Sequence, residues 1–117
     1  AKVIRNDNRY GITIIETGLG RLSIPECQFE VGQRFRVRIL SDDVSITLSK
    51  SKDSSISNIF KVKVKKIATD SKHMKIITLE SGSTQIKARI TKKSSEILNL
   101  ELNDEVFAQI KTVAITY

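Results

Sequence analysis

Apolar and basic residues take alternate positions along several stretches of the chain. In the clearest stretch, 34–39, Phe35, Val37 and Ile39 alternate with three arginines. A period of two is typical of β-strands that bury one face. The same strong alternation predicts strands at 60–65, 86–91 and 106–111. Weaker alternation predicts five more strands, at 11–15, 21–24, 44–48, 74–79 and 113–116.

Residues that favour turns separate these predicted strands. They include Gly, Asp and Ser, and they cluster at 17–20, 31–33, 41–43, 70–72 and 81–83. One short helix is predicted at 91–98, because hydroxyl side chains that cap helices precede Ile97 and Leu98. The most polar segment, 49–55, is the predicted linker. About nine short strands and one helix indicate an all-β barrel or sandwich.

The sequences on the two sides of the linker resemble each other. Residues 11–18 are similar to 75–82, and residues 34–46 are similar to 105–115. Such an internal repeat predicts two related β units in tandem, which we place at 1–52 and 53–117. Each unit would be a small OB-like barrel of four or five strands. Units of this size bury little surface alone, so we expect them to pack on each other.

Composition narrows the setting in which the chain works. Its 117 residues include 20 Lys and Arg against 13 Asp and Glu, which gives a net charge of +7. Only 5% of the residues are aromatic, so we expect the core to be aliphatic. No apolar run approaches the roughly 18 residues of a membrane-spanning helix. Cys27 is the only cysteine, which excludes an internal disulfide and fits a reducing, cytoplasmic location. The chain begins with Ala1, and we expect it to be part of a longer protein.

The sequence lacks the constellations that enzymes need. His73 and Cys27 are the only histidine and cysteine, so one chain assembles neither a Cys/His nucleophile pair nor a four-ligand zinc site. We expect His73 in a polar hairpin, Cys27 as a small buried apolar group, and the acidic pair at 42–43 in a solvated turn. No phosphate-binding G-x-x-x-x-G-K-[ST] motif is present. We therefore expect no enzymatic activity from this chain.

Hydroxyl and cationic side chains remain as candidates for binding a ligand, and they lie where strands are predicted to end. Thr91 and Ser94 stand at the start of the predicted helix, whose free N–H groups favour an anion. Lys111 and Thr112 follow the last alternating strand. A compact tetrahedral dianion could exchange its hydration shell for such donors. Ordinary helix capping and a solvated lysine explain the same residues, and spacing alone favours that second interpretation.

The second unit resembles the molybdate-binding Mop module of the TOBE, or transport-associated OB, domains. The resemblance rests on an opening S-x-x-N at 55–58, a strand at 61–67, A-x-I-T-x-x-S at 88–94, L-x-L at 98–100, and V-x-A-x-I-K-[ST]-x-x-[VI] at 106–115. Residues 35–46 resemble the region that joins this module to the ATPase in molybdate ABC transporters. The chain is therefore similar to the C-terminal regulatory domain of the ATP-binding subunit.

This resemblance implies a ligand, molybdate or tungstate, held near subunit boundaries by paired modules of a homodimer, without a covalent cofactor or a metal-ion site. It also implies that the full-length protein contains an ABC ATPase domain and contacts a membrane permease at the inner face of the cell membrane. Lys111 would supply charge and the hydroxyls geometry, whereas the first unit would be scaffold. The candidate oxyanion-binding residues are Ser55, Ser57, Asn58, Arg89, Thr91, Ser94, Lys111 and Thr112.

Ser57 departs from the pattern of the family. Its position commonly holds an arginine, whose rigid guanidinium suits an oxyanion well. Arg89, on the polar side of its strand, is the candidate to compensate for that loss. The substitution also keeps open an alternative, a structural dimerisation domain that no longer binds a ligand.

The positive charge raises another alternative, a nucleic-acid-binding OB module. Lysines at 61, 63, 65 and 66 would supply its basic surface. Such modules also present exposed aromatic rings on which bases stack. Phe35, Phe60 and Tyr10 are expected on apolar strand faces instead, so we expect no nucleic-acid partner.

Overall fold

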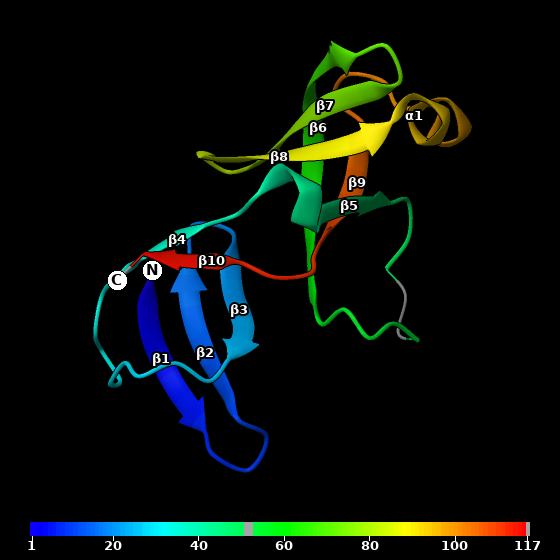
Figure 1. Ribbon diagram of the computed structural model, residues 1–117. Coiled ribbons are helices and arrows are strands. Elements are labelled where there is room, and N and C mark those ends of the chain that lie inside the picture. Colours follow the sequence, from blue (N-terminus) through cyan, green and yellow to red (C-terminus); the bar gives the residue numbers. More distant parts are fainter. Residues whose placement is uncertain (51–52, 117) are drawn as a thin grey trace.

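The computed structural model describes residues 1–50 and 53–116, which form three β-sheets and one α-helix (Figure 1). The first sheet is an antiparallel meander of β1 (Lys2–Asp7), β2 (Ile12–Thr17) and β3 (Gly20–Pro25). A two-stranded sheet pairs β4 (Arg36–Arg38) with β10 (Ala114–Thr116). The largest sheet contains, in spatial order, β5 (Val44–Thr47), β9 (Glu105–Ile110), β6 (Asn58–Ser71), β7 (Met74–Ser81) and β8 (Thr84–Thr91).

All nine predicted strands are present, and so is the predicted helix, α1 (Lys92–Leu98). Sequence alternation missed β1, because a bulge between Val3 and Arg5 interrupts the period of two. It also underestimated β6, where a bulge between Val64 and Lys66 shifts the phase of the apolar positions. The predicted linker at 49–55 includes residues 51 and 52, which lie outside the described residues.

The two halves of the chain exchange strands. In Figure 1 the chain leaves β4, crosses to the large sheet through the short 3-10 helix η1 (Ser41–Asp43), and adds β5 beside β9. After β9 it returns, and β10 pairs with β4. We call the three-stranded and two-stranded sheets together the first body, and the five-stranded sheet with α1 the second body. Each half therefore completes a sheet of the other. The boundary between residues 52 and 53 stays a prediction, since strands from both sides of it share sheets.

The predicted all-β, OB-like fold class is confirmed, although the sheets do not close into continuous barrels. In the first body, an isolated bridge between Lys2 and Arg34 links β1 to the segment before β4. In the second body, η1 packs beside β8, and no described ladder joins β8 to β5. No helix among the described residues is long and apolar enough to cross a membrane.

The core is aliphatic, as predicted. Every fully buried hydrophobic residue described is Val, Ile, Leu or Ala. Phe29 and Phe35 are half-buried with ring centroids 4.5 Å apart, and Phe60 packs partly against the same core. The prediction for Tyr10 was wrong, because it lies in the β1–β2 turn with 65% of its surface exposed. The Asp7 carboxylate accepts the backbone N–H of Tyr10 there, at 3.3 Å, which favours a turn over a strand.

Candidate functional site

The eight candidate residues lie in two groups. The Lys111 group contains Ser55, Ser57, Asn58, Lys111 and Thr112, where β6 begins and β9 ends. The Thr91 group contains Arg89, Thr91 and Ser94, where β8 ends and α1 begins. Within the described part of the chain, no hydrogen bond joins a side chain of one group to the other. The structure therefore does not bring the eight candidate residues together within one chain.

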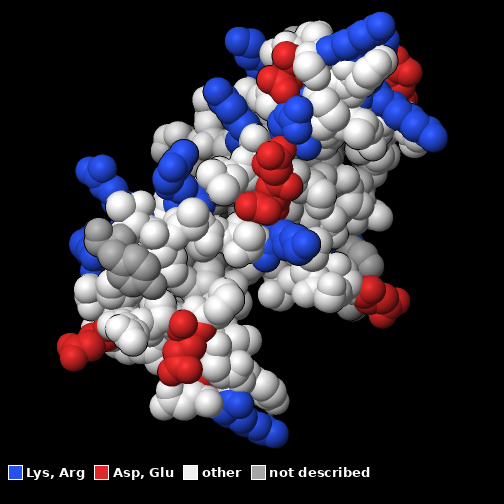
Figure 2. Space-filling model, in the orientation of Figure 1, with Lys and Arg blue, Asp and Glu red and all other residues white. Residues whose placement is uncertain are grey.

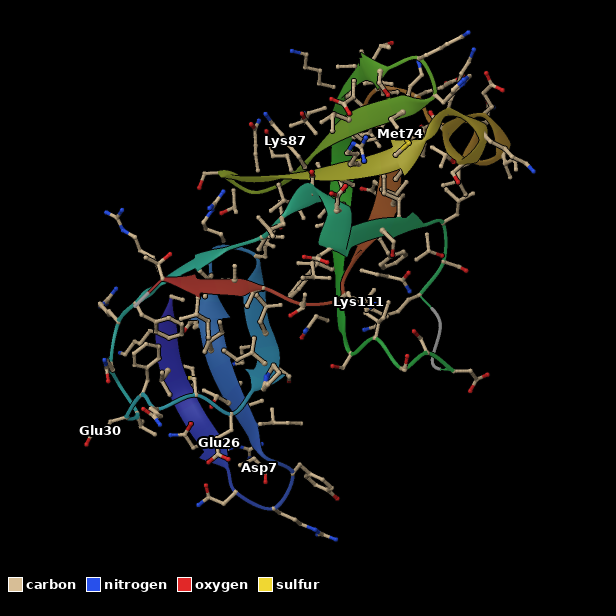
Figure 3. The ribbon with its side chains drawn as sticks, in the orientation of Figure 1. Asp7, Glu26, Glu30, Met74, Lys87 and Lys111 are labelled. Atoms are coloured by element: carbon tan, nitrogen blue, oxygen red, sulfur yellow. The ribbon has the colours of Figure 1, made fainter. Side chains whose placement is uncertain are left out.

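The pairing of β6 with β9 determines the position of the Lys111 group. Asn58 and Ile110 form the last pair of that ladder, so Ser57 and Lys111 follow at the same end and both are exposed. The backbone N–H of Lys111 donates to the carbonyl oxygen of Asp43 at 2.9 Å, which fixes its backbone against η1. Figure 3 shows Lys111 where the chain leaves β9 toward β10. Its ammonium group has no ion pair with any described residue.

Asn58 has a structural role in this arrangement. Its side chain is buried, its Oδ1 accepts the backbone N–H of Ser23, and its Nδ2 donates to the Ser23 carbonyl, both at 2.8 Å. These two bonds join β6 to β3 and satisfy both polar ends of the amide. Sequence reasoning missed Ser23, since no local pattern reports a contact across 35 residues.

The Thr91 group is organised by capping of α1. Thr91 is the N-cap, and its Oγ1 accepts the Ser94 backbone N–H at 3.0 Å and donates to Ser94 Oγ at 2.9 Å. The backbone N–H of Lys92 donates to the carbonyl oxygen of His73 at 2.8 Å. His73 lies in the turn of the β6–β7 hairpin, as predicted. The two hydroxyls therefore lie together, exposed at the surface, with only part of the helix N-terminus free for a ligand.

A small cavity opens beside this cap. Its volume is about 400 Å³, and it is lined by His73, Met74, Thr91, Lys92, Lys93 and Glu96. Figure 3 shows Met74 near the start of α1, well away from Lys111. Two lysines favour an anion there, whereas the Glu96 carboxylate opposes one. No residue of the Lys111 group contributes to this cavity.

Arg89 contacts carboxylates from two other elements. Its Nε donates to Asp70 at 2.8 Å on β6, and its Nη1 lies 3.4 Å from Asp42 in η1. The hydrogen bond with Asp70 is the main cause that raises the pKa of Arg89 above its ordinary value. The structure therefore places the guanidinium between η1 and β6 and does not bring it to Ser57.

The role of Asp42 was missed because the pair 42–43 was interpreted as a solvated turn. The carboxylate is largely exposed, yet it lies beside β8 because the chain crosses into the second body at this point. Exchange of strands is a long-range event, and no sequence signal near residue 42 reports it.

The described residues contain no cluster of acidic, His and Cys side chains able to hold a metal ion. The donors on offer are hydroxyls and ammonium groups, which suit an anion.

Comparison with known proteins gives a consistent picture. The sequence profile of the TOBE domain matches residues 54–116. The molybdenum import ATP-binding protein ModC of Hahella chejuensis is 36% identical over 116 residues, which are 98% of this chain and 32% of that protein. ModC of Saccharophagus degradans is 40% identical over 95 residues, 80% of this chain and 26% of that protein. The chain thus spans about a third of the length of such relatives.

A solved structure shares the fold. It is a crystal structure of the cytoplasmic molybdate-binding protein ModG with molybdate bound, and it superposes with a TM-score of 0.75. The match covers 90% of this chain and 81% of the other, at 23% sequence identity.

Proposed function

The chain belongs to the TOBE domain family, and from that membership we propose that it binds molybdate or tungstate as a regulatory and dimerisation domain of a molybdenum importer. The relatives named above are ATP-binding import proteins, and the structural neighbour carries molybdate. Full-length relatives are about three times longer, so the ATPase domain, the permease and the location at the inner face of the membrane belong to this proposal.

The observation that carries the proposal is the setting of Lys111. Its side chain is exposed and forms no ion pair with a described residue, and it follows the last pair of the β6–β9 ladder at the end where Ser57 precedes β6. A cation beside hydroxyl donors can replace the hydration shell of a tetrahedral dianion. Thr112 follows Lys111 in the chain and Ser55 lies three residues before Asn58, and both are exposed, so we propose their hydroxyls as further donors.

A complete site requires a second copy of the chain. Thr91 and Ser94 lie apart from Lys111, so we propose that a homodimer places the Thr91 group of one copy near the Lys111 group of its partner. The anion would then accept hydrogen bonds from both copies and favour the paired arrangement. Regulation follows only if the anion binds that arrangement more tightly than another one.

The structure gives little support to the nucleic-acid alternative. Phe29 and Phe35 pack on each other, and Phe60 is half-buried beneath Gly20, so these rings do not form an open stacking platform. Tyr10 is exposed but lies in a turn beside Arg9, whose guanidinium is 5.1 Å from the ring centroid. Tyr10 is the one exposed aromatic ring among residues 1–50 and 53–116, which is a weak basis for binding a strand of bases.

Isothermal titration with molybdate, tungstate and sulfate tests the proposal on the full chain. We expect saturable heat with molybdate and tungstate, little with sulfate, and a dimer in sedimentation experiments. Molybdate at about 100 times its Kd should stabilise the fold by about 2.7 kcal/mol, or roughly 10 °C in Tm. A well-folded dimer without heat or stabilisation would leave the structural alternative, a dimerisation domain without a ligand.

A further inference from the structure

A groove of about 860 Å³ lies at the junction of the two bodies, apart from both candidate groups. One wall comes from β4 and the residues after it, and the other comes from the first half of β8. The β2–β3 turn closes one end, where Gly18 lies directly against the side chain of Thr84. Figure 1 shows β4 passing beside the tip of the β7–β8 hairpin. None of the eight candidate residues lines this groove.

The groove is basic. Arg36, Arg38 and Lys87 line it, and no Asp or Glu does. None of these three side chains forms an ion pair with a described residue. In Figure 2 blue side chains lie over the region where β4 approaches the tip of the β7–β8 hairpin. An uncompensated set of cations in a concave site favours an anionic ligand.

The cations are spaced like side chains along an extended peptide. Arg36 and Arg38 are two residues apart on β4, so they project to the same side about 7 Å apart. Gln85 and Lys87 have the same relation on β8 and are exposed, whereas Ile86 between them is buried. A strand with acidic residues at alternate positions repeats at that same distance.

The first half of β8 also offers a free sheet edge. β8 is the outermost strand of the five-stranded sheet, and β7 is its only ladder partner among the described strands. Near its end, Arg89 contacts Asp42 of η1, which covers that part of the edge. Residues 85–87 instead face the groove. Unpaired backbone N–H and C=O groups along a strand are a template for a further strand.

From these features we infer that the groove is a docking site for an extended acidic peptide, which pairs with the edge of β8 at residues 85–87. Carboxylates at alternate positions of the peptide reach Arg36, Arg38 and Lys87. Apolar residues between them point toward the inner face of the sheet, on the side of Ile86. The volume far exceeds that of one tetrahedral oxyanion, so this site is distinct in ligand and place from the proposed molybdate site.

The test uses a fluorescent eight-residue peptide of alternating Glu and Val, with fluorescence anisotropy on the full chain. A peptide with four Glu followed by four Val has the same charge and composition without the alternation. We expect the alternating peptide to bind at least about tenfold more tightly, a difference of about 1.4 kcal/mol. Amide hydrogen exchange should slow at residues 85–87 in the complex, because those backbone groups become paired.

A matched pair of variants separates the groove from general attraction to a basic protein. Arg36→Gln with Arg38→Gln should weaken binding about tenfold. Lys63→Gln with Lys65→Gln removes the same charge from exposed alternate positions of β6, outside the groove, and should leave binding unchanged. The inference would be overturned if both double variants lost the same affinity for the peptide, or if both peptides bound equally well. Unchanged amide hydrogen exchange at residues 85–87 would overturn it too. Tighter binding of linear polyphosphate than of the peptide would also overturn it, since polyphosphate gains nothing from a sheet edge.

Discussion

The backbone N–H of Lys111 donates a hydrogen bond of 2.9 Å to the carbonyl oxygen of Asp43. This bond ties the end of β9 to η1, and the neighbouring Asp42 ties η1 to Arg89 on β8. A segment of the first half therefore determines where the candidate cation of the second half lies. Strand exchange thus contributes directly to the geometry of the proposed site.

Replacing Lys111 should weaken anion binding more than any other single loss of charge. Lys111→Met removes the ammonium group but keeps the apolar stem, so the fold should survive. We expect the Kd for molybdate to rise at least about tenfold, since charge-assisted hydrogen bonds are about twice as strong as neutral ones. Titration calorimetry measures the change. Lys72→Met, at an exposed position in the β6–β7 turn, is the matched control and should leave the Kd near its original value.

Ser57→Arg should strengthen anion binding. Residue 57 and Lys111 follow the last pair of the β6–β9 ladder at the same end, so a guanidinium there brings a planar set of donors to the end of the ladder that carries the ammonium group. We expect a Kd for molybdate lower by roughly tenfold, about 1.4 kcal/mol. Ser57→Gln, similar in reach but uncharged, separates charge from length. If the arginine gives no gain, the geometry of a binding site is absent and the purely structural alternative gains support.

Asn58→Ala should destabilise the fold. The buried amide makes both of its hydrogen bonds to Ser23, and its removal leaves a backbone N–H and a carbonyl without partners. We expect a loss of about 2 kcal/mol in the free energy of unfolding, measured by urea denaturation. Asn8→Ala, in an exposed turn, is the control and should change stability by less than about 0.5 kcal/mol. Equal effects of the two substitutions would show that the amide does not hold β3 to β6.

The ion pair of Arg89 with Asp70 should couple more strongly than the one between Lys61 and Glu105. Side-chain exposure is 36% and 38% in the first pair but 63% and 55% in the second, so water screens the first pair less. Double-mutant cycles with Gln and Asn replacements measure both couplings. We expect the first coupling energy to be about twice the second. A ratio of one or less contradicts this ranking.

Gly18→Ala should disturb the contact between the two bodies. A Cβ at residue 18 would overlap Oγ1 of Thr84, whereas Cβ and Cγ2 of that side chain, at 3.2 and 3.3 Å, would only be tight neighbours. We expect a loss of roughly 1 to 3 kcal/mol in thermal or urea unfolding. Thr84→Ala should restore most of that loss in the double variant while costing little alone. Failure of this rescue would show that the two turns do not meet as described.

Local periodicity was sufficient to predict most of the fold. Alternation located β8 and β9 almost to the residue, because each buries one face of a regular ladder. It failed at β1 and the second part of β6, where bulges change which residues face inward. Thr91 and Ser94 were predicted to bracket a helix start, and the cap between them is present.

The surroundings of the candidate residues were beyond local patterns. Nothing near Arg89 in the sequence identifies Asp42, 47 residues earlier, as its neighbour. Asn58 belongs to a recognisable motif, yet its partner Ser23 lies in the other half of the sequence. Contacts of this kind depend on how the two halves meet, and that depends on which sheet receives β5 and β10.

Because β5 and β10 each sit in the sheet of the opposite half, neither half is a self-sufficient folding unit. A chain severed between residues 50 and 53 would yield fragments whose missing edges are filled only by the other fragment. Split expression of this protein should therefore report complementation, with soluble material appearing when both fragments are made together. In the intact chain the covalent link keeps the two halves close together, and each half needs a strand of the other to complete its sheet.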